Sequence, residues 1–166
     1  MILRHFAVML GVIVGCMASI GPVSAQVVAL GASNTEGKGV GSSEAFPAQL
    51  QAMLRAKGAA MSVTNAGVSG DTTGGMLARL ASAVPQGTRI VIVQYGGNDA
   101  RKGESGSRAA NIAAIENQLR TRHIKILRAD GLVLAALRAG MMQPDGIHLT
   151  VAGHQRVAAQ LLQSIR

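Results

Sequence analysis

Residues 90–99 read IVIVQYGGND, and this stretch decides the fold class. Its first four residues are β-branched throughout, which is typical of a strand buried on both faces of a sheet. Two glycines and two short polar residues follow directly, so the strand ends in a loop that exposes polar groups. A fully apolar strand that runs into such a loop indicates a parallel α/β sheet.

The segments on either side repeat this pattern. Strands are predicted over Val27–Leu30, Met61–Asn65 and Ile124–Leu127, in addition to Ile90–Val93. Apolar residues at helical spacing separate or follow them, in the segments 46–54, 76–84, 112–119, 132–137 and 157–165. Alternation of strand and helix predicts a parallel sheet with helices on both faces, built as one domain over residues 26–166.

Small and polar residues follow the predicted strands. Ser33 comes after the first strand, Gly70 after the second and Asn98 after the third, while Asp145 and His148 lie between the fourth strand and the last helix. In open α/β sheets, ligands bind beyond the carboxyl ends of the strands. The topology therefore brings these five residues to one edge of the sheet.

Their chemistry is that of nucleophilic catalysis. A serine hydroxyl is a weak nucleophile until a base within hydrogen-bond reach takes its proton, and His148 can act as that base. Asp145, three residues earlier, can orient the imidazole and stabilise the imidazolium. The Gly70 N–H and the Asn98 amide can donate to a developing oxyanion. We therefore expect Ser33, His148 and Asp145 to be catalytic.

Four stretches carry a family resemblance: VVALGASNTEG, VTNAGVSGDTTGGMLARL, VQYGGNDARKG and QPDGIHLTVAGHQRVAAQLL. They resemble the conserved blocks of SGNH (GDSL-like) hydrolases, and look closest to the branch of arylesterases and acyl-CoA thioesterase/lysophospholipases. The resemblance implies a flavodoxin-like α/β/α sandwich with a four- to five-stranded parallel sheet. It also implies a serine esterase or thioesterase that forms an acyl-serine intermediate, with an oxyanion hole made by the Ser33 and Gly70 N–H groups and the Asn98 side chain. Its substrate would be a small-molecule ester or thioester.

Two departures from the family pattern leave an alternative open. Ala32 stands where the family usually has Asp in its Gly-Asp-Ser motif, and the stretch between Asn98 and Asp145 is about one strand–helix unit short. These departures motivate a second hypothesis, a catalytically idle SGNH module that binds an envelope glycan or lipid. Such a module would retain a ligand but would not react with a fluorophosphonate.

Residues 1–25 have the pattern of a secretory signal peptide. Arg4 and His5 precede an apolar run that ends in Val23-Ser24-Ala25, with small residues where a signal peptidase cleaves. The prediction is a periplasmic or secreted protein that begins at Gln26, without stable membrane insertion after cleavage. An alternative is a lipoprotein anchored through Cys16, because Ile13-Val14-Gly15-Cys16 resembles a lipoprotein box.

The formal net charge of +8 comes from basic residues that are scattered along the sequence, which favours a solvated basic surface. Only one Tyr and two Phe are present, too few for the stacking platforms of a single-strand nucleic-acid binder. No cofactor or metal is predicted. His123 is expected to end a helix and His154 to lie on a helix surface, and neither has the surroundings of a metal ligand.

Overall fold

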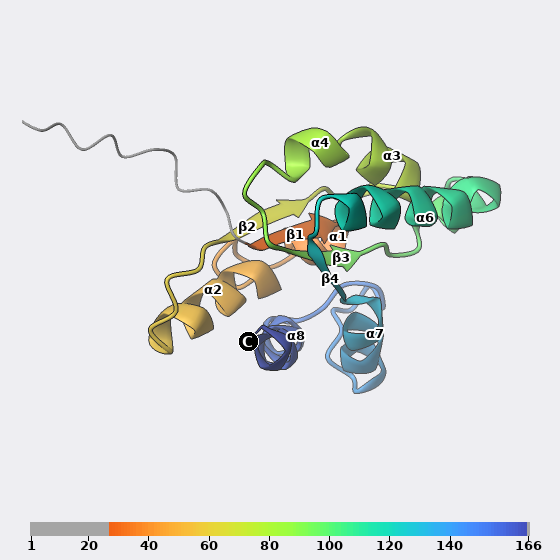
Figure 1. Cartoon of the computed structure of the whole chain (residues 1–166). Coiled ribbons are helices and arrows are strands. Elements are labelled where there is room, and N and C mark those ends of the chain that lie inside the picture. The colour runs from red at the N-terminus through yellow and green to blue at the C-terminus, as the bar shows by residue number, and fades with distance from the viewer. Residues whose placement is uncertain (1–26, 166) are drawn as a thin grey trace, which may run out of the picture.

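The computed structural model describes residues 27–165, which form the three-layer α/β/α sandwich in Figure 1. The sheet has four parallel strands in the order β2-β1-β3-β4. Their bounds are β1 Val27–Gly31, β2 Val63–Gly67, β3 Ile90–Gln94 and β4 Lys125–Arg128. The predicted fold class and the four-stranded parallel sheet are confirmed.

Helices cover both faces of the sheet. One face packs against α2 Phe46–Ala56, α7 Asp130–Arg138 and α8 Val151–Ser164. The other packs against α3 Thr73–Ala78, α4 Leu80–Ala83 and α6 Ser105–Thr121. Two single-turn helices, α1 Ser33–Glu36 and α5 Asn98–Arg101, follow β1 and β3 directly.

The alternation of side chains along β1 and β3 explains the two layers. Successive residues of a strand point to opposite faces, so an unbroken apolar strand supplies both cores at once. Val27 and Ile92 belong to the core under α2, α7 and α8, whereas Val28 and Val93 belong to the core under α3, α4 and α6. All residues of β1 and β3 are buried. The two central strands therefore hold the site-bearing loops on a rigid base.

Two elements differ from the sequence prediction. The single helix expected over 76–84 is two short helices that break at Arg79, whose side chain is tied to Asp71 and to the Gly31 carbonyl. The second strand runs over Val63–Gly67 and not 61–65. It is an edge strand with no fully buried residue, so its hydrophobic pattern defines its bounds weakly.

The predicted signal peptide and Cys16 lie outside the described residues. Within residues 27–165, no helix is long and apolar enough to cross a membrane.

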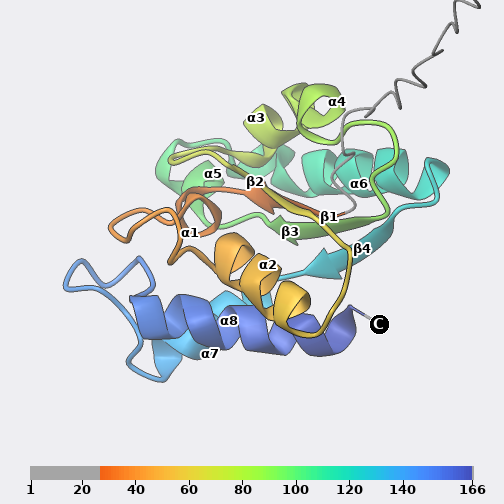
Figure 2. The same ribbon diagram turned by 90° about the vertical axis from the view of Figure 1, so that its left-hand side faces the viewer.

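Figure 2 shows the two ends of the sheet. The loops that follow the strands gather at the end with α1 and α5, and the C-terminus lies at the opposite end.

Candidate active site

Ser33 lies at the carboxyl end of the central strand β1, as the first residue of α1. The turn before it is tight, because a Cβ at Gly31 would lie 2.1 Å from Thr35 Oγ1 and 2.9 Å from the Gln94 carbonyl oxygen. Only glycine fits there. The turn directs the Ser33 hydroxyl towards the loop that precedes α8.

Ser33, His148 and Asp145 form one chain of hydrogen bonds. His148 Nε2 lies 3.0 Å from Ser33 Oγ, and His148 Nδ1 lies 2.5 Å from Asp145 Oδ2. The carboxylate can only accept, so Nδ1 carries the proton and Nε2 is free to accept from the serine hydroxyl. The hydrogen bond from the His148 side chain, with those from the His148 and Ile147 backbone N–H groups, holds the pKa of Asp145 well below its ordinary value. The structure thus brings together the three residues that were predicted to be catalytic.

Asn34 holds the histidine loop against the serine turn. Its Nδ2 donates to the Ile147 carbonyl at 3.1 Å, and its Oδ1 accepts from the Leu149 N–H at 2.9 Å. These two groups flank His148 in the chain, so one buried amide fixes the backbone on both sides of the imidazole. Sequence reasoning missed this role, because a contact across 113 residues leaves no local pattern.

Ala32 stands where the family usually has an aspartate, and the side chain of Gln94 braces the serine turn from the neighbouring strand β3. Its Oε1 accepts from the Ala32 N–H at 3.4 Å and from Thr35 Oγ1 at 3.2 Å. Ala32 itself is buried in the core under α3, α4 and α6. The turn is therefore anchored from β3 through side-chain bonds that do not need an acid at position 32.

Asn98 begins α5 at the end of β3 and is almost fully buried. One hydrogen of its amide goes to the Asp71 carbonyl at 2.8 Å, and its Oδ1 accepts from Arg101 at 3.0 Å. An amide nitrogen carries two hydrogens, so one remains available to a ligand. Asn98 and Ser33 line the same cavity.

Gly70 lies in the turn after β2, in the left-handed region with φ +78°. The flanking residues connect this turn to the site, since the Val68 N–H donates to the Gly31 carbonyl and the Asp71 carbonyl accepts from Asn98. Gly70 does not itself line the cavity that contains Ser33 and Asn98. The turn is adjacent to the site, and space around the Gly70 Cα is open.

A buried ion pair between Asp99 and Arg108 lies next to Asn98 and stabilises the loops at the carboxyl edge of the sheet. Asp99 is fully buried and accepts from the N–H and hydroxyl of Thr73, and from Arg108 at 2.9 Å. Burial alone would raise the pKa of Asp99, but these hydrogen bonds outweigh it and hold the pKa below its ordinary value. Asp71 pairs with Arg79 at 2.7 Å. Both acids brace loops of the site.

The cavity beside Ser33 has a volume of about 400 Å³. One wall is apolar and comes from α7 and the histidine loop, through Val133, Leu134, Leu137 and Ile147. The lining also includes the polar groups of Asn98, Arg101 and Arg108. A cavity lined by both apolar side chains and hydrogen-bond donors suits a substrate with a hydrocarbon part and a polar, reactive part.

The expectation for His154 was wrong. Its side chain is fully buried, its Nδ1 accepts from the Phe46 N–H at 3.2 Å, and its ring stacks on Phe46 at 6.3 Å. Burial lowers the pKa of His154 to about 4. His154 stands three, four and seven residues before Val157, Ala158 and Leu161, which are all buried, so helical spacing carried a signal that was not used.

A serine, a histidine and an aspartate hydrogen-bonded in series, at the carboxyl edge of a parallel sheet, is the arrangement that α/β serine hydrolases use. Comparison with known proteins agrees with this class. The sequence profile of the GDSL-like Lipase/Acylhydrolase family matches residues 29–141, and the chain belongs to this family. It is thus an ester-hydrolysing enzyme of the SGNH type.

Among its relatives, esterase TesA of Pseudomonas aeruginosa is 27% identical over 191 residues, covering 92% of this chain and 95% of TesA. A crystal structure of TesA superposes with a TM-score of 0.72 and 26% identity, over 84% of this chain and 97% of that one. Psychrotrophic esterase EstA from Pseudoalteromonas sp. has the same fold, with a TM-score of 0.74 at 18% identity over 85% and 96% of the two chains. The alignment with TesA is longer than this 166-residue chain, so TesA contains segments that this chain lacks.

Proposed function

We propose that this protein hydrolyses carboxylic esters and thioesters through an acyl-serine intermediate on Ser33. The observation that carries the proposal is the unbroken hydrogen-bonded series from Ser33 Oγ through His148 to Asp145, at the rim of the cavity that contains Asn98. This geometry supports the following roles for the individual residues.

Attack begins when Ser33 Oγ bonds to the acyl carbon and its proton passes to His148 Nε2. The carbonyl π electrons move to oxygen, and the resulting imidazolium is stabilised by the Asp145 carboxylate at Nδ1. The pKa of Asp145 is held low, so it remains an anion at neutral pH and can take this role.

The oxyanion would be held by the backbone N–H groups of Ser33 and Gly70 and by the second hydrogen of the Asn98 amide. Asn98 is well placed for this, because bonds to Asp71 and Arg101 fix the orientation of its amide before substrate arrives. Loss of one such donor typically lowers kcat by about 10²–10³-fold.

The tetrahedral intermediate then collapses and the bond to the alcohol or thiol breaks. The leaving group takes the proton from His148, and the acyl group stays on Ser33. A water molecule then attacks the acyl carbon while His148 takes one of its protons. The bond between the acyl carbon and Ser33 Oγ breaks, the carboxylic acid leaves, and His148 returns the proton to Ser33 Oγ. The same series of steps works with oxygen or sulfur as the leaving atom, so the proposed substrates include thioesters.

A short acyl chain suits the cavity. About 400 Å³ is near the lower end of the range for small-molecule pockets, about 300–1,000 Å³. The acyl chain of the substrate would lie along Val133, Leu134 and Leu137 of α7, the helix that follows β4. Two relatives support an ester substrate by their names. One is esterase TesA, and the other is an arylesterase from Vibrio mimicus that is 33% identical over 53% of this chain.

The test measures hydrolysis of p-nitrophenyl esters of increasing acyl length, and of matched acyl-CoA thioesters, by the wild type and by Ser33→Ala and His148→Ala. We expect turnover to fall at least 10³-fold in both variants, with a maximum at short chains in the wild type. A fluorophosphonate should label the wild type and not Ser33→Ala. Unlabelled wild-type protein that is folded and inactive on every ester would contradict the proposal and favour the idle binding module.

A further inference from the structure

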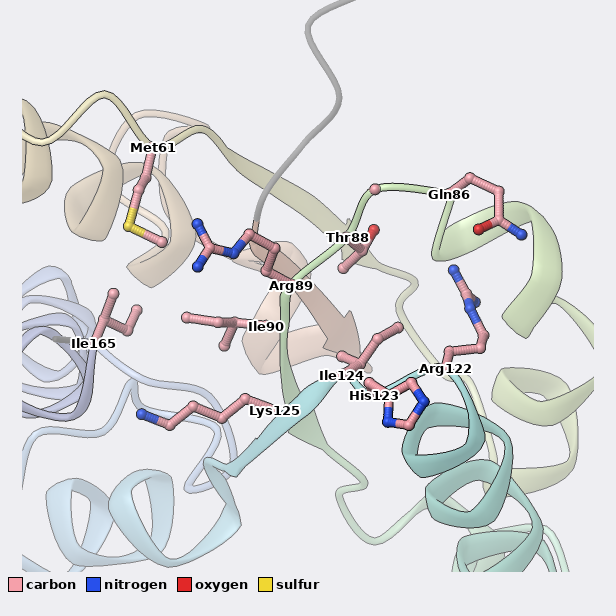
Figure 3. A pocket seen from close by; sticks show the side chains of 11 residues that line it. Met61, Gln86, Thr88, Arg89, Ile90, Arg122, His123, Ile124, Lys125 and Ile165 are labelled. Carbon is pink, nitrogen blue, oxygen red and sulfur yellow. The ribbon is translucent and has the colours of Figure 1, made fainter.

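A second cavity lies away from the active site. It has a volume of about 680 Å³ and opens at the amino ends of the strands, the opposite edge from Ser33. Arg89 and Ile90 line it from the start of β3, Lys125 from the start of β4 and Arg122 from the turn before β4. Figure 3 shows Arg89 and Lys125 on either side of Ile90, with Ile165 facing them.

The cations of this cavity have no acidic side chain as a partner among residues 27–165. The Arg89 side chain makes no hydrogen bond or ion pair with any described residue, as the bonds of residues 27–165 show. Arg122 donates to the carbonyls of Val84 and Pro85, and Lys125 donates to the carbonyl of Ser164. Carbonyls leave the positive charge uncompensated, and no Asp or Glu lines the cavity.

This cavity lies at an edge whose connecting segments carry cations and no acid. The connections from helix to strand, residues 57–62, 84–89 and 122–124, contain Lys57, Arg89 and Arg122 and no acid. The segments 32–45, 68–72 and 95–104 lie at the catalytic edge and contain acids as well as cations: Glu36, Glu44, Asp71, Asp99 and Glu104 with Lys38, Arg101 and Lys102. Lys57 lies beside the cavity, because it lines a neighbouring hollow that shares Ile165. We call residues Lys57, Arg89, Arg122, His123 and Lys125 the basic edge.

Helix ends explain only part of the basic edge. Lys57 and Arg122 directly follow the last turns of α2 and α6, where a cation offsets the helix dipole, so their positions need no ligand as an explanation. Arg89 and Lys125 belong to strand starts, where no such effect acts. Both are exposed, and both face an apolar floor that includes Ile90 and Ile165.

We propose that the basic edge is a second binding site, which takes phosphate groups at the surface of an anionic phospholipid membrane. Cations around an apolar floor match lipid phosphates that lie above the acyl boundary. The chain also enters the described region at this edge, at Val27, eleven residues after Cys16. A protein docked in this way points Ser33 away from the membrane, because five-residue strands, about 15 Å long, separate the two edges. Its substrates would then arrive from the aqueous side.

The experiment compares two double variants that lower the net charge equally. Arg89→Gln/Lys125→Gln removes two cations from the basic edge, and Lys38→Gln/Lys102→Gln removes two exposed cations from the catalytic edge. Each protein is produced by export of the full chain, so any contribution of residues 1–26 is common to all. Co-sedimentation is measured with vesicles of phosphatidylcholine alone and with added phosphatidylglycerol, and melting temperatures check that both variants fold.

We expect binding that requires phosphatidylglycerol and weakens with salt. Arg89→Gln/Lys125→Gln should lose about fivefold in affinity for each cation removed, roughly 25-fold in all, while the catalytic-edge variant stays near the wild type. Equal losses in the two variants, or no dependence on phosphatidylglycerol, would overturn the proposal. Binding of inorganic pyrophosphate at Arg89 and Lys125 without vesicle binding would also overturn it, in favour of a soluble phosphate ligand.

Discussion

His154 makes the stability of this protein depend on pH in a way that can be calculated. The side chain is fully buried at the start of α8, and its Nδ1 accepts the N–H of Phe46, the first residue of α2. The neutral tautomer with hydrogen on Nε2 is thereby selected, and Nε2 has no partner among the described residues. Protonation would remove the acceptor for Phe46 and place a charge between two helices.

The magnitude follows from the pKa, which burial lowers from an ordinary 6.5 to about 4. The unfolded chain therefore binds more protons than the folded protein between these two values, and folding stability falls as pH decreases through this window. The difference corresponds to about 3 kcal/mol, fully present above pH 6.5 and largely lost by pH 4.

The assay is urea unfolding of the wild type and of His154→Gln at a series of pH values from neutral to about 4.5. Gln offers an acceptor to the Phe46 N–H but does not titrate. We expect the wild type to lose about 2–3 kcal/mol more than the variant over this range, since all other groups are shared. A variant that loses as much stability as the wild type would refute the reasoning.

Two further predictions concern the site and the N-terminus. Asn34→Ala removes both bonds that flank His148. It should therefore lower the free energy of unfolding by about 2–3 kcal/mol and lower kcat at least tenfold, with little change in KM. An unchanged kcat on p-nitrophenyl butyrate would show that the histidine loop keeps its position without Asn34. Exported protein should begin at Gln26 on N-terminal sequencing. A lipid-modified Cys16 in the same preparation would identify the lipoprotein alternative instead.

Much of the fold and most of the candidate site were predictable from the sequence. Some signals are local. Burial on two faces restricts the residue types of a few adjacent positions, as in the apolar strand Ile90–Val93, and a tight turn does the same at Gly31–Ser33. Parallel topology then requires that strand-end residues share an edge. That is why Ser33, Asn98 and His148 could be placed together without a structure.

Other features depend on packing between distant segments. Asn34 bonds to the backbone on both sides of His148, Gln94 braces the serine turn from a neighbouring strand, and Arg79 interrupts a helix by reaching the end of β1. Such contacts have no fixed spacing along the chain. They are decided by which elements meet, so they are visible only in the folded molecule.

The distribution of charge shows the same division. Along the sequence the cations are scattered, which favours an unremarkable solvated surface. Folding brings some of them together, because a parallel sheet sends every helix-to-strand connection to one edge. The sequence by itself determined the succession of strands and helices, a sheet covered on both faces and the candidate reactive residues. Only the tertiary structure decided that Arg89, Arg122 and Lys125 would surround one cavity, since that depends on segments that meet in space and not along the chain.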